Sequence, residues 1–116
     1  MHPHDLIRIR HMLDAASDAL SFAVGRQRAD LDKDRQLLLS IVKSLEIIGE
    51  AASKVSAPTR EAYTQIPWHA IITMRHRLVH GYFDIDHEVV WQTILSDIPS
   101  LIRQLEDLLK KIKDQE

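Results

Sequence analysis

Apolar residues recur at three- and four-residue steps along most of this chain, and this spacing restricts its fold more than any other feature. Such a period places them on one face of an α-helix. It is clearest in residues 5–26, in residues 33–55 and after residue 87. The positions that form these stripes are Leu6, Ile9, Leu13, Ala16, Leu20, Ala23, Val24, Leu37, Leu38, Ile41, Val42, Leu45, Ile48, Ala52, Val90, Ile94, Ile98, Leu101, Leu105, Leu108 and Ile112. Only three glycines occur in 116 residues, which further favours helices over a sheet.

A chain of 116 residues has room for one core. It contains no repeat, low-complexity segment or linker, so residues 1–116 are predicted to form a single domain. The expected fold is all-α, an up-and-down bundle of four to five helices with short connections.

The breaks between the helices follow local signals. Residues 27–34 form a hinge in which Asp30 or Asp32 can cap the second helix. A short helix begins near Pro58, and a central helix is expected over residues 68–80. Asp84 or Asp86 can cap the last long helix, in which Pro99 predicts a kink.

Gly49 lies on the apolar face of the second helix. Glycine within a helix costs about 1 kcal/mol relative to alanine. Its presence predicts that another backbone passes close to this point, the alternative being a tolerated defect.

Composition excludes several classes of protein. Cysteine is absent, which rules out disulfides and thiolate metal sites, and no apolar run approaches the ~20 residues that span a membrane. The first residues lack the continuous apolar core of a signal peptide, so we expect a cytoplasmic protein without a cofactor. The net charge of −2 gives no general attraction to nucleic acid, so any such binding must use a local basic patch.

Unusual chemistry is concentrated in one short stretch, which contains Arg75, His76, Arg77, His80 and Tyr82. On a regular helix, Arg75 falls in the apolar arc, where a guanidinium must be paired or must face an anion. Two interpretations remain open: a buried ion pair with Glu46 or Glu50, and a phosphate clamp.

His80 precedes Gly81, a residue type common just beyond a helix C-terminus. There the helix dipole favours a protonated imidazole, so His80 is either a plain capping residue or a proton donor. The i, i+4 spacing of His76 and His80 also matches two zinc ligands on one helix. A third ligand is not evident beyond His69, Asp84 or His87, and no metal site is predicted.

The segment Arg75-His76-Arg77-Leu78-Val79-His80-Gly81-Tyr82 resembles the Arg-x-x-x-x-His-x-Tyr motif of the HEPN superfamily, and specifically the HepT-like toxins of HepT/MntA toxin–antitoxin systems. Residues 44–52, 66–68, 90–91 and 97–99 are similar to recurrent blocks of that family in the same order. One residue departs from the pattern, because His76 stands where asparagine is frequent.

The resemblance implies a homodimer whose motif helices line a shared cleft and which acts as a metal-independent endoribonuclease. An RNA 2′-hydroxyl attacks the adjacent phosphate if a base takes its proton and a cation stabilises the phosphorane. His80 is the candidate acid/base and Arg75 the phosphate stabiliser, with His76 and Arg77 as helpers. DNA lacks the 2′-hydroxyl and would not be cut.

The family also implies an MntA-like minimal nucleotidyltransferase antitoxin that transfers AMP to the motif tyrosine, Tyr82. The added charge and bulk would block the anion site. Two alternatives remain: a non-catalytic helical subunit that docks a nucleotidyltransferase, and a metal-dependent phosphohydrolase.

Helical geometry places the two principal candidate residues, Arg75 and His80, on different faces. On a regular helix, Arg75 and His80 lie about 140° apart. They can therefore act together only if the last turn distorts near Gly81 or if two chains build the site, and we expect the second, a homodimer.

Overall fold

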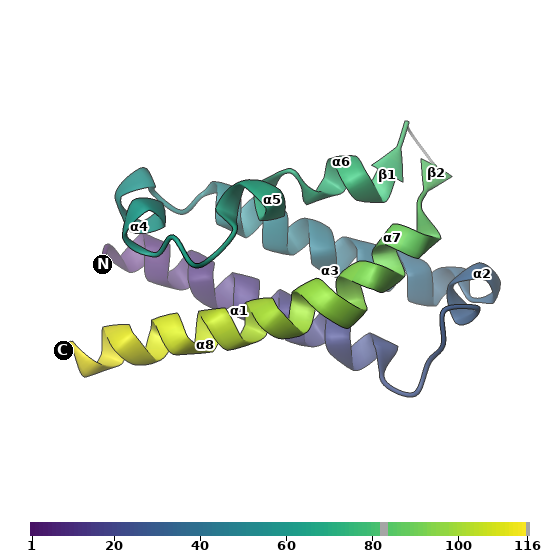
Figure 1. Ribbon diagram of the computed structural model, residues 1–116, viewed down its shortest axis with the longest axis horizontal. Helices are drawn as coiled ribbons and strands as arrows, with labels where there is room; N and C mark the ends of the chain where they lie inside the picture. The colour runs from purple at the N-terminus through teal and green to yellow at the C-terminus, as the bar shows by residue number, and fades with distance from the viewer. Residues whose placement is uncertain (82–83, 116) are drawn as a thin grey trace.

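The computed structural model describes residues 1–81 and 84–115, and helices account for most of them (Figure 1). The α-helices are α1 (Pro3–Ala23), α2 (Asp30–Lys33), α3 (Arg35–Ser53), α4 (Ala57–Ala62), α5 (Trp68–Ile72), α6 (Met74–Leu78), α7 (His87–Gln92) and α8 (Ile98–Asp114). Two short strands, β1 (Val79–His80) and β2 (Asp84–Ile85), separate α6 from α7, and a π-helical turn, η1 (Thr93–Asp97), joins α7 to α8.

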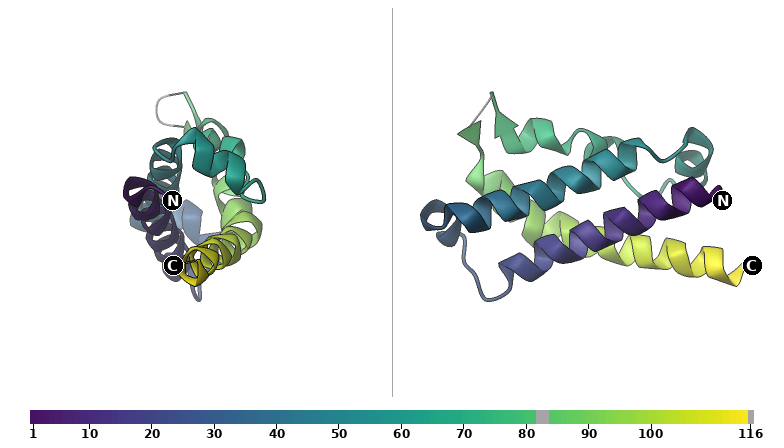
Figure 2. Two further views of the ribbon diagram at one scale, coloured as in Figure 1. Left: turned by 90° about the vertical axis from the view of Figure 1, so that its left-hand side faces the viewer. Right: turned by 180° about the vertical axis from the view of Figure 1, so that it is seen from behind.

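These elements form four antiparallel runs (Figure 1, Figure 2). Helix α1 packs along α3. Helices α5 and α6 then pack against α3, and the run from α7 to α8 packs against α1. The start of α1 and the end of α8 lie at one end of the bundle, and the β1–β2 hairpin lies at the other. The predicted all-α up-and-down bundle is confirmed. Within residues 1–81 and 84–115, no helix is long and apolar enough to cross a membrane.

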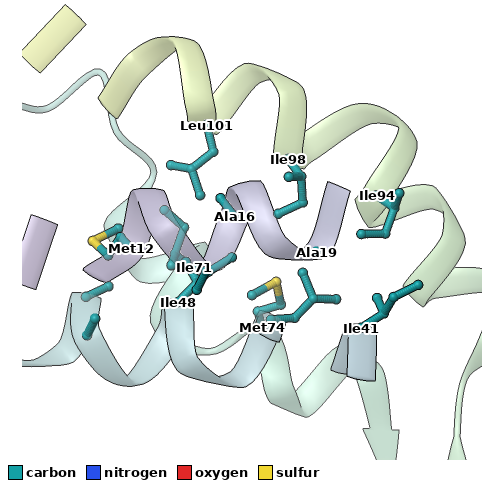
Figure 3. Close-up of a cluster of buried hydrophobic side chains, with 14 of the residues drawn as sticks. Met12, Ala16, Ala19, Ile41, Ile48, Ile71, Met74, Ile94, Ile98 and Leu101 are labelled. Carbon is teal, nitrogen blue, oxygen red and sulfur yellow. The ribbon is translucent and has the colours of Figure 1, made fainter. Parts of the chain in front are cut away.

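The core draws on all four runs, as Figure 3 shows. Small side chains on α1, Ala16 and Ala19, leave room for branched residues from the other helices. The buried side chains around them include Met12, Ile41, Ile48, Ile71, Met74, Ile94, Ile98 and Leu101. They coincide largely with the apolar stripes of the sequence.

The two long N-terminal helices lie within a few residues of their predicted bounds, but the residue that caps the second was predicted wrongly. Asp34 caps α3, because its Oδ1 accepts a hydrogen bond from the Leu37 N–H at 3.1 Å. Asp30 instead accepts from the Gln27 N–H at 2.7 Å, at the start of the single turn α2. The predicted hinge thus contains a helical turn of its own.

Gly49 marks a close contact between two backbones, as predicted. A Cβ atom at this position would lie 3.0 Å from the carbonyl oxygen of Ile71 on α5. Real Cβ atoms seldom come so near a backbone oxygen, so glycine lets α5 pack directly on α3.

A kink was predicted at Pro99, and the structure has the π turn η1 directly before this residue. Pro99 lies in the first turn of α8, directly after η1, and its nitrogen has no hydrogen to donate to the preceding turn. Immediately before it, the Ile98 N–H bonds to the Thr93 carbonyl, the wider spacing of a π turn.

The continuous central helix predicted over residues 68–80 was wrong. Helix α5 ends at Ile72, and the Thr73 hydroxyl donates to the His69 carbonyl at 2.7 Å, a side-chain bond that often bends helices. Helix α6 ends at Leu78, because Val79 is extended and pairs with Ile85. His80 therefore lies in a strand.

Candidate functional site

The site is built around His80, which the hairpin carries at one end of the bundle. The two strands pair Val79 with Ile85 and His80 with Asp84. Gly81 has φ of +71°, a left-handed conformation that glycine adopts without strain, so it turns the chain back after His80. The predicted capping position at a helix C-terminus is thus wrong, and the argument from the helix dipole no longer applies to His80. Tyr82 lies outside the described residues.

A carboxylate lies beside the imidazole. His80 Nε2 is 3.2 Å from Asp86 Oδ2, and the His80 side chain is 56% exposed. The other oxygen of Asp86, Oδ1, accepts a hydrogen bond from the Val89 N–H at 3.1 Å and so caps α7. One aspartate therefore joins the hairpin, the imidazole and the next helix.

The contacts of Asp86 favour its ionised form. Its pKa is lowered, chiefly by the hydrogen bond from the Val89 backbone N–H and next by the hydrogen bond with His80. The carboxylate is therefore a hydrogen-bond acceptor at neutral pH.

Arg75 is exposed, in contrast to its predicted place on an apolar face. Its side chain is 59% exposed, and its guanidinium lies beside α3 and not in the core. It lies 3.6 Å from Glu46 Oε1 on α3, whereas Glu50 pairs with Lys54 at 3.2 Å. Glu46 is one of the two partners considered for a buried ion pair, but the contact is a loose one at the surface and contributes little to stability.

The other basic residues of α6, His76 and Arg77, do not take part in the contact with Glu46. His76 and Arg77 are both exposed. Arg77 lines a cavity of about 350 Å³ with residues of α5, η1 and α8, whereas Arg75 lines a smaller one, of about 130 Å³, against α3. Arg75 and Arg77 therefore lie on different sides of the α5–α6 run, one toward α3 and the other toward η1 and α8.

A larger hollow than either of these lies elsewhere. It measures about 720 Å³ and is lined by the N-terminal residues, including Asp5, together with residues of α4. It contains none of the residues predicted to be functional, so volume alone does not locate the chemistry.

Metal ligands do not gather in the part of the chain that the structure describes. Within residues 1–81 and 84–115, no three His, Asp or Glu side chains are close enough together to hold an ion. His76 and His80 do not share a helix, because α6 ends between them at Leu78.

The argument for two chains changes with this geometry. Two arrangements were considered that would let Arg75 and His80 act together: a distorted last turn, or a site built by two chains. The helix does end before Gly81, so the first arrangement is possible. Helical geometry therefore no longer requires a second chain, and homodimerisation stays a prediction that rests on the resemblance.

Asp86 is the site residue that the sequence did not reveal. The sequence offered it only as one of two possible caps of the last helix, the other being Asp84, and the structure shows that Asp86 is the cap. The available signal was Gly81 between Val79 and Ile85, two apolar residues that pair if the chain folds into a hairpin. Such a hairpin brings residues on either side of the turn together.

The fold and the site together define a small helical-bundle protein with an exposed, carboxylate-paired histidine next to a basic helix. Residues 12–108 match the family described as Ribonuclease HepT-like, and the chain belongs to this family. That confirms the resemblance seen in the motif.

Named relatives agree with this assignment. A predicted RNase from Caldanaerobacter subterraneus subsp. tengcongensis is 36% identical over 90% of this chain and 94% of its own. A predicted ribonuclease HepT from Thermococcus cleftensis is 38% identical over 66% of this chain and 70% of its own. No solved structure matches the chain.

Proposed function

We propose that this protein is an endoribonuclease that cuts RNA by attack of a 2′-hydroxyl on the adjacent phosphate, without a metal ion. The observation that carries the proposal is the exposed His80 imidazole, held by Asp86 directly after the basic helix α6. Membership in the Ribonuclease HepT-like family and the names of the relatives support the reaction class.

The reaction needs a base, an acid and a cation. A base takes the proton of the 2′-hydroxyl as its oxygen bonds to phosphorus, and an acid gives a proton to the 5′-oxygen as its bond to phosphorus breaks. In-line attack places these oxygens on opposite sides of the phosphorus. Two copies of His80 in the proposed homodimer, one neutral and one protonated, would supply both groups.

Arg75 is the proposed cation. Its weak pair with Glu46, 3.6 Å long and largely exposed, can be exchanged for a phosphate at little cost. The planar guanidinium can donate two hydrogen bonds to a phosphorane. His76 and Arg77 would add positive potential, and a dimer would concentrate it despite the net charge of −2.

Cleavage of a single-stranded RNA in excess chelator is the direct test. We expect fragments with 2′,3′-cyclic phosphate ends, and no cutting of the matched DNA. An RNA with one 2′-deoxy nucleotide at a cleaved position should lose cleavage at that bond alone, because the attacking hydroxyl is absent. Cutting at the deoxy position, or activity only after a divalent metal is added, would contradict the mechanism.

Control of the enzyme is proposed to act through Tyr82. In the proposed toxin–antitoxin pair, an MntA-like nucleotidyltransferase transfers AMP to this tyrosine and so places a phosphate close to Arg75 in the sequence. After co-expression with such a partner, intact-protein mass spectrometry should show an added AMP unit that maps to Tyr82. The Tyr82→Phe variant should keep its unmodified mass, and modification at Tyr63 would contradict the assignment.

A non-catalytic binding subunit is the second candidate, and one surface favours it. Val24 is 74% exposed and Leu95 is 55% exposed, and both border a cavity of about 240 Å³ that Trp91 also lines. Apolar groups exposed together often mark protein interfaces. Inactivity on every RNA, together with a tight complex with a nucleotidyltransferase, would favour this candidate over the ribonuclease.

A further inference from the structure

The contact between His80 and Asp86 involves only one of the two ring nitrogens. Nε2 lies 3.2 Å from Asp86 Oδ2. Among the hydrogen bonds of the described residues, none involves Nδ1 of His80, and its side chain is 56% exposed. The ring thus has one nitrogen committed to the protein and one available to a ligand.

Asp86 is itself held from three directions. Its backbone N–H donates to the Leu78 carbonyl at 2.7 Å, across the hairpin. Its Oδ1 accepts from the Val89 N–H at 3.1 Å, and Oδ2 faces His80. The carboxylate therefore has little freedom to follow the imidazole, and the imidazole must orient to it.

We infer that Asp86 is the positioning residue of the site: it holds the Nε2–H tautomer of His80 and leaves Nδ1 as the atom that exchanges a proton with RNA. An ionised carboxylate can only accept, so a neutral imidazole opposite it carries its proton on Nε2. The role in catalysis rests on the proposed ribonuclease function, whereas the tautomer does not.

The assignment fixes how the proton moves. As base, Nδ1 takes the 2′-hydroxyl proton and the ring becomes an imidazolium, whose Nε2–H faces the negative carboxylate. As acid, the imidazolium gives the proton on Nδ1 to the leaving 5′-oxygen and returns to the neutral Nε2–H form. Asp86 keeps its charge throughout and touches no reacting atom.

A purely structural role for Asp86 is the competing explanation, and Asp34 provides a matched control for it. Asp34 caps α3 by the same contact, with Oδ1 accepting from the Leu37 N–H at 3.1 Å. Its other oxygen, Oδ2, lies 3.5 Å from Arg26 rather than beside a histidine. The same substitution at Asp34 removes a capping charge without affecting His80.

Asp86→Asn separates the two roles. Asparagine caps helices as well as aspartate does, so α7 should be retained. Its amide nitrogen would face Nε2 as a donor and force the proton onto Nδ1, the wrong atom for a base. We expect kcat for RNA cleavage to fall about 10- to 100-fold with KM unchanged, a part of what acid–base catalysis contributes. Asp34→Asn should keep the wild-type kcat.

Nitrogen-15 NMR of the ring supplies a measurement that does not depend on activity. At a pH where the ring is neutral, wild-type His80 should be mainly the Nε2–H form and Asp86→Asn mainly the Nδ1–H form. A wild-type ring protonated on Nδ1 overturns the inference, even if the Asp86 variant fails to fold. Wild-type kcat in a folded Asp86→Asn protein overturns the catalytic role and leaves the ribonuclease proposal standing. A wild-type protein that cuts no RNA but shows the Nε2–H form refutes the proposed function and supports the assigned tautomer.

Discussion

Replacing His80 with glutamine is expected to lower kcat for RNA cleavage by about 10²- to 10⁴-fold, the usual contribution of a general acid or base. Glutamine keeps a polar group that can reach Asp86 but cannot exchange a proton near neutral pH. The side chain is 56% exposed, so the fold should be retained. Single-turnover cleavage of a labelled RNA, with circular dichroism to verify folding, measures the effect.

His87 offers a close control for this substitution. Its Nδ1 lies 2.7 Å from Asp32 Oδ1, so it is another histidine paired with an aspartate, but it lies outside the motif. His87→Gln should retain the wild-type rate. Equal rates for wild type, His80→Gln and His87→Gln would remove His80 from the mechanism, and equal losses in the two variants would indicate a general effect of breaking such pairs.

Replacing Asp5 with alanine should destabilise the protein by about 2–4 kcal/mol, because it removes three hydrogen bonds to a buried carboxylate and leaves the buried Thr59 hydroxyl without this acceptor. Asp5 is only 3% exposed. Its carboxylate accepts from the Ser56 N–H at 2.9 Å, from the Ser56 hydroxyl at 2.6 Å and from the Thr59 hydroxyl at 2.7 Å. These bonds tie α1 to the start of α4. Urea denaturation measures the loss, and Asp14→Ala, at an exposed position on α1, should change stability by less than about 0.5 kcal/mol.

The effect of Asp5 should also depend on pH. Burial acts to raise its pKa, but the hydrogen bonds from Ser56 and Thr59 outweigh burial, so the pKa in the folded protein is lowered. A lowered pKa means that the carboxylate stabilises the fold fully above the unfolded pKa, about 4, and that this stabilisation is lost as pH falls through the folded pKa. The difference in unfolding free energy between wild type and Asp5→Ala should therefore shrink below about pH 4. A difference that stays constant from pH 7 to pH 3 would exclude this role.

The long helices could be predicted from sequence because many residues repeat the same signal. The stripes that contain Ile41, Leu45 and Ile48 bury that face in the structure, and Gly49 packs against a backbone as expected. The prediction of a continuous central helix was wrong because interactions of single residues end the helix. Neither the Thr73 hydroxyl bond to His69 nor the pairing of Val79 with Ile85 produces a periodic pattern.

The candidate site could be predicted in part for a similar reason. The resemblance to the family motif identified Arg75 and His80 as candidates, since it depends on residue types and not on geometry. The exposure of Arg75 could not be predicted from a helical wheel, because a long side chain at the edge of an apolar face can extend to the surface, as Arg75 does toward Glu46. The contact of Asp86 with His80 could not be predicted, because it depends on the hairpin, which brings together residues on either side of Gly81.

The close approach of α5 to α3 at Gly49 affects where the residues of the motif lie. Arg75 meets Glu46 on α3, one turn from the glycine that sets how near α5 approaches that helix. His80, in contrast, is attached through Asp86 to α7. The Glu46 contact is weak, so Arg75 is placed by the packing of α5 and α6 on α3, whereas His80 is held on α7. If Arg75 and His80 act together as proposed, the distance between guanidinium and imidazole depends on how α3 and α7 pack, and substitutions at this contact on α3 are expected to change it.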